Sequence, residues 1–107
     1  MDYYVEDAMD VIKNLKNNPY GVKDSYHSID RARLRDVDLN VVTRYIAQGF
    51  LVGIEKSLNE NGIFRLLYEH TKFFDLAIVI NILDEDEVLI MTVVEKRINR
   101  RHCLKLS

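Results

Sequence analysis

The chain is predicted to be a single α+β domain, with N-terminal helices packed on a four-stranded antiparallel β-meander. Apolar residues follow helical spacing before Gly49 and alternate with weaker positions after it. The 107 residues are 48% hydrophobic and 30% charged, which is typical of one globular domain rather than a disordered chain. Residues 1–107 are therefore expected to form one two-layer domain.

Three helices are expected in the first half of the chain, over residues 4–17, 29–36 and 39–48. The first has amphipathic spacing and stops before a cluster of helix-breaking residues around Pro19. Asp38 precedes the third helix and is a suitable N-cap.

Four strands are expected after the helices, near residues 50–54, 63–70, 73–83 and 87–95. Asn61-Gly62 is a strong hairpin signal between the first two. The connections are short enough to join neighbouring antiparallel strands.

The last two expected strands carry a second apolar face. Its members are Phe73, Ala77, Val79, Leu83, Leu89, Met91 and Val93. Because three helices are too few to cover both faces of the sheet, we expect a protein partner or a second copy of the chain to cover part of this face.

His27, Arg31 and Arg35 recur every four residues and would share one ridge of a helix. A histidine moves protons near neutral pH, and arginines hold a phosphate by paired hydrogen bonds. The ridge has two interpretations. It is either a catalytic anion site or a structural network in which the arginines pair with acidic residues of the sheet.

The end of the chain is basic although the formal net charge is −2. Lys96, Arg97, Arg100 and Arg101 are candidate contacts to a nucleic-acid backbone. The alternative is that the basic tail keeps this end of the chain solvated.

His70 is a second candidate acid–base group, at a strand end beside Tyr68 and Glu69. The alternative is a histidine at the end of a strand that makes its hydrogen bonds to water and has no catalytic role. Further possible proton carriers are Glu69, Glu95, Tyr45 and Tyr68. The third histidine, His102, lies in the tail, so no catalytic role is expected for it.

Other chemistries lack support in the sequence. Neither a metal-ligand spacing nor a glycine-rich phosphate loop is found, so we expect no metal and no cofactor. The acidic run from Asp84 to Glu87 has the character of a solvated turn. A single cysteine, an acidic N-terminus and the lack of a long apolar run predict a cytoplasmic protein with no membrane contact.

The order of the expected elements, together with the His27-x-x-x-Arg31-x-x-x-Arg35 spacing, resembles a family of small prokaryotic domains of unknown function. That family is placed near the BrnT-like and RelE-like toxins of toxin–antitoxin systems. The resemblance covers residues 24–102 and leaves the helix over 4–17 outside. The Lys-His-Gly element of the BrnT group is absent, so a BrnT-type active site is not carried over.

The resemblance implies a toxin-like, RNA-targeting domain that acts as a metal-independent endoribonuclease and pairs with an antitoxin protein. His27, Arg31, Arg35 and His70 would then be the catalytic candidates. The second hypothesis is a non-catalytic module that binds a protein, or a second copy of itself, through the apolar face of its sheet.

Overall fold

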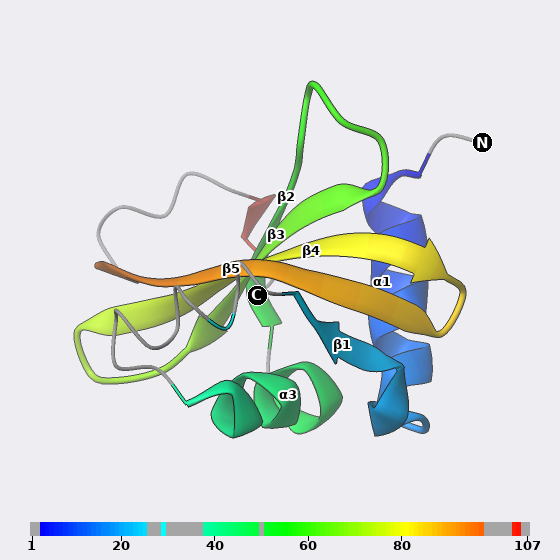
Figure 1. Cartoon of the computed structure of the whole chain (residues 1–107). Helices are drawn as coiled ribbons and strands as arrows, with labels where there is room; N and C mark the ends of the chain where they lie inside the picture. The colour runs from blue at the N-terminus through cyan, green and yellow to red at the C-terminus, as the bar shows by residue number, and fades with distance from the viewer. Residues whose placement is uncertain (1–2, 26–28, 30–37, 50, 98–103, 106–107) are drawn as a thin grey trace.

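The computed structural model describes residues 3–25, 29, 38–49, 51–97 and 104–105 (Figure 1). Two helices pack on one face of a mixed β-sheet, so the α+β class is confirmed. Among the described residues, no helix combines the length and the apolar character needed to cross a membrane.

Helix α1 spans Val5–Leu15 and confirms the first expected helix. The Asp7 carboxylate accepts a hydrogen bond of 2.7 Å from the backbone N–H of Tyr4, which fixes the start of the helix. Its buried stripe is formed by Ala8, Val11, Ile12 and Leu15. These side chains belong to the same core cluster as the sheet, so α1 is an integral part of the fold.

A short 3-10 turn, η1 (Pro19–Gly21), leads into strand β1 (Val22–Asp24), which the sequence pattern does not predict. A Cβ atom on Gly21 would lie 1.9 Å from the carbonyl oxygen of Asp86. The approach of these two backbones therefore requires glycine at position 21.

Helix α3 spans Leu39–Gln48, as expected from the sequence. The Asp38 side chain accepts a hydrogen bond of 2.9 Å from the backbone N–H of Asn40, so the predicted N-cap is confirmed. Of the helix expected over 29–36, Ile29 alone lies within the described residues, where it is helical.

The sheet contains β2 (Leu51–Lys56), β3 (Ile63–Glu69), β4 (Phe74–Asp84), β5 (Glu87–Arg97) and β6 (Leu104–Lys105), together with β1. The strand order is β1-β5-β4-β3-β2-β6. Strands β2 to β5 pair antiparallel with their sequence neighbours.

The whole sheet is not the purely antiparallel, four-stranded sheet expected. Strand β1 adds to β5 in parallel, and β6 adds to β2. Strand β1 is three residues long, too short to produce a recognisable alternation in the sequence. The likeness to a RelE or BrnT fold stays a prediction.

The core lies between the helices and one face of the sheet. Fully buried Val42 and Ile46 of α3 belong to the same cluster as the inward side chains of the central strands. On β3 and β4 this face carries Phe64, Leu66, Tyr68, Leu76, Ile78 and Ile80.

The opposite face differs in part from the expectation. Ala77 is buried there, and Val79 and Leu89 are half-buried. Val93, however, belongs to the helix-covered core, because an irregularity in the β4–β5 register at Val79 shifts the alternation of β5. Phe73 lies outside the strands and is 67% exposed.

Candidate functional site

The predicted site residues divide between described and undescribed parts of the chain. His27, Arg31, Arg35, Arg100 and Arg101 lie outside the described residues. His70, Lys96 and Arg97 lie within them, and these three are placed below.

His70 directly follows β3, in the turn that leads to β4. Its backbone N–H donates to the carbonyl oxygen of Phe74 at 3.2 Å, and that of Thr71 donates to the same oxygen at 2.9 Å. The Thr71 hydroxyl accepts a hydrogen bond of 3.2 Å from the N–H of Phe74. The turn is therefore closed by three hydrogen bonds and holds His70 in a defined position.

The imidazole of His70 lies between a phenol and a carboxylate. Its Nδ1 atom is 2.9 Å from the hydroxyl oxygen of Tyr45, and its Nε2 atom is 3.5 Å from Oε1 of Glu95. The His70 side chain retains 23% exposure, so solvent and small groups have access to it. We refer to Tyr45, His70 and Glu95 as the His70 cluster.

Strand register brings these residues together. Tyr68 pairs with Leu76, and Leu76 pairs with Glu95, so the three side chains share the helix-covered face. His70 follows Tyr68 by two residues and keeps to the same side, while Tyr45 reaches it from α3. Glu69 falls on the opposite side by the same alternation and is not part of the cluster.

The ring of Tyr68 packs against the ring of Tyr45. The two rings are stacked with centroids 6.1 Å apart, and the Tyr45 ring meets His70 edge-on at 5.8 Å. Tyr68 is 1% exposed, and its hydroxyl has no hydrogen-bond partner among the described residues. Burial raises the pKa of the Tyr68 phenol, so this group stays neutral and supports Tyr45 by packing.

The tautomer of His70 that suits both neighbours carries its proton on Nε2. Nδ1 then accepts the hydrogen bond of the Tyr45 hydroxyl, and the Nε2 proton faces Glu95. At 3.5 Å, Glu95 acts on the ring chiefly through its negative charge. The cluster thus places an imidazole between a hydroxyl group and a carboxylate.

Lys96 and Arg97 do not form one continuous surface. Arg97 is two residues beyond Glu95 on β5 and opposite Phe74, so it lies at the same end of the sheet as His70. Lys96 pairs with Asp75 and projects from the opposite face. Of these two predicted phosphate contacts, Arg97 alone accompanies the His70 cluster.

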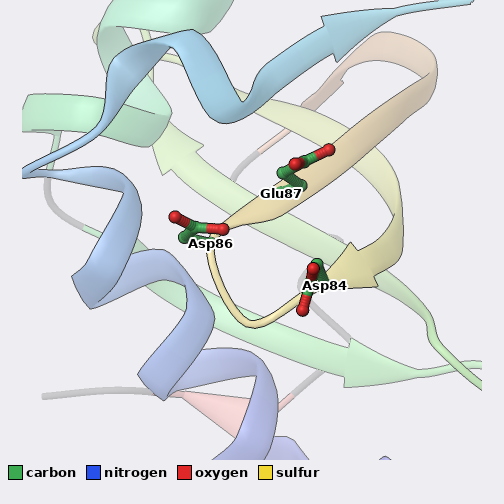
Figure 2. Close-up of side chains that lie close together, drawn as sticks. All are labelled: Asp84, Asp86 and Glu87. Carbon is green, nitrogen blue, oxygen red and sulfur yellow. The ribbon is translucent and has the colours of Figure 1, made fainter.

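The acidic turn between β4 and β5 contacts side chains from the segment between α1 and β1 and from β1 itself. Carboxylate oxygens of Asp84, Asp86 and Glu87 lie within 4.8 Å of one another (Figure 2). Asp86 accepts a hydrogen bond of 3.3 Å from Asn18, and Glu87 forms an ion pair of 2.8 Å with Lys23 that raises the lysine pKa. Two of the three carboxylates are thus engaged by side chains from the α1–β1 region.

The chain matches no protein-family model, no curated protein and no solved structure. Roles for individual residues therefore come from the site itself. Tyr45 and Glu95 had appeared in the sequence only as secondary candidates. The signal that links them to His70 is the register of β3, β4 and β5, combined with the position of α3.

Proposed function

We propose that this domain is a toxin-like, metal-independent endoribonuclease in which His70 is the proton carrier. The observation that supports it is the position of His70 between the Tyr45 hydroxyl and the Glu95 carboxylate. A histidine oriented on one side by a carboxylate and facing a hydroxyl on the other is the usual arrangement of a general base.

Cleavage of RNA without a metal uses the neighbouring 2′-hydroxyl as nucleophile. Its oxygen attacks phosphorus, the bond from phosphorus to the 5′-oxygen breaks, and a 2′,3′-cyclic phosphate forms. In the proposed step, His70 takes up the 2′-hydroxyl proton through the hydroxyl of Tyr45, and Glu95 stabilises the resulting imidazolium.

The pentavalent phosphate and the leaving 5′-oxygen need further groups. Arg97 supplies a cation at the same end of the sheet. The acid that protonates the 5′-oxygen must stand on the far side of the phosphate from the base. Among the proton carriers that the sequence predicts, we assign this role to His27.

The test is an RNA cleavage assay with the purified chain in the presence of a metal chelator. We expect wild-type protein to cleave RNA, and His70→Gln to lose about 100-fold or more of the rate, the usual contribution of an acid–base group. His102→Gln is the matched control and should keep the wild-type rate. Absence of cleavage by the wild type, or full activity in His70→Gln, would refute the proposal.

A second candidate function is a protein-binding module. It is favoured by the sheet face opposite the helices, where Val79, Leu89 and Val94 are only half-buried. A stoichiometric partner such as an antitoxin, or a dimer detected by light scattering, combined with no ribonuclease activity, would select this function instead.

A further inference from the structure

The turn between β3 and β4 presents an aromatic ring to solvent. Phe73 is 67% exposed, although a phenylalanine gains free energy from burial. The hydrogen bonds of His70, Thr71 and Phe74 described above hold the backbone of this turn. The exposed ring is therefore carried on a fixed support, three residues from His70.

Positive charge accompanies the exposed ring. The Lys72 ammonium lies 5.6 Å from the centroid of the Phe73 ring. Arg97 pairs across the sheet with Phe74, the next residue. An exposed aromatic ring with a lysine ammonium beside it is the chemistry that binds a nucleotide, with its base on the ring and its phosphate at the cation.

We infer that Phe73 is a stacking platform for an unpaired base, so that the substrate of the His70 cluster is single-stranded RNA. This inference rests on the proposed function. A base within a duplex has both faces covered by its neighbours, whereas a single-stranded base has a face free to stack on a side chain. Phe73 and His70 belong to one turn, so the stacked nucleotide is next to the bond that is cleaved.

The test measures binding separately from cleavage. The probes are a fluorescent single-stranded oligonucleotide with 2′-O-methyl riboses, which lacks the nucleophile, and the same strand annealed to its complement. Phe73→Leu keeps an apolar side chain but removes the ring, and Phe73→Trp enlarges the ring. Leu58→Ala is the control, because Leu58 is 98% exposed in a different turn.

We expect tighter binding to the single strand than to the duplex. Phe73→Leu should weaken single-strand binding by about 5-fold to 150-fold, the range measured for loss of one stacked base. Phe73→Trp should bind at least as tightly as the wild type, and Leu58→Ala should match it.

The two proposals fail in different ways. Unchanged binding by Phe73→Leu, or equal affinity for duplex and single strand, would overturn the stacking role while leaving a His70-dependent cleavage intact. If the wild type binds neither probe and cleaves no RNA, the proposed function falls and the stacking role falls with it.

Discussion

The substitution Tyr45→Phe removes a single oxygen atom from the His70 cluster. The ring that stacks on Tyr68 at 6.1 Å is retained. The hydrogen bond of 2.9 Å to Nδ1 of His70 is lost. Any effect of the variant is therefore attributable to that hydrogen bond.

The expected cost in stability follows from the surroundings of the bond. A net hydrogen bond between neutral groups contributes about 0.5–1.5 kcal/mol to folding. The His70 side chain is 23% exposed, so water replaces part of the lost partner. We expect Tyr45→Phe to lower the free energy of unfolding by about 1 kcal/mol or less.

A double-mutant cycle isolates this interaction from other effects of each change. Tyr45→Phe, His70→Gln and the double variant are unfolded in urea, all in the same buffer. The double variant should be more stable than the sum of the single effects predicts, by about 0.5–1 kcal/mol. Tyr20→Phe is the control, because Tyr20 is 92% exposed.

The catalytic arm of the same experiment uses the RNA cleavage assay. Tyr45→Phe should lower the rate by about 100-fold if the hydroxyl carries the proton to His70. A coupling energy below about 0.3 kcal/mol would show that the two side chains act independently. That result would refute the cluster as a connected unit, and with it the role given to Tyr45.

Two predictions address the rest of the fold. Leu15→Ala should lower the free energy of unfolding by about 2–5 kcal/mol, because Leu15 is 0% exposed in the shared core. Met9→Ala is the control, because Met9 lies on the same helix and is 42% exposed. An unchanged free energy of unfolding in Leu15→Ala would mean that α1 is not an integral part of the fold. Asp24→Asn should raise the Tm at pH 7 but not at pH 3, since burial raises the pKa of Asp24 above its ordinary value of 3.8. When the pKa of a carboxyl is higher in the folded than in the unfolded protein, the protein loses stability as the pH rises. Equal Tm differences between Asp24→Asn and the wild type at both pH values would therefore contradict a raised pKa of Asp24.

Local pattern was sufficient for the elements that depend on near neighbours. The N-cap of α3 at Asp38 needs only a carboxylate beside free N–H groups, and both come from adjacent residues. The alternation of Phe64, Leu66 and Tyr68 likewise places one side of β3 inward without reference to the rest of the chain.

Features that depend on distant residues were not predictable in this way. Strand β1 is held by parallel pairing with β5, more than sixty residues further along the chain, and its own three residues carry no period. The shift of Val93 to the core depends on an irregularity that appears only when β4 and β5 are paired.

The candidate site shows the same division. The sequence by itself predicted that His70 lies at the end of the strand expected over residues 63–70, on the same side as Tyr68, because side chains of a strand alternate. Only the tertiary structure decided that Tyr45 and Glu95 meet it. Their contact requires α3 to pack over the sheet and three strands to pair in register, and neither condition is encoded by spacing along the chain.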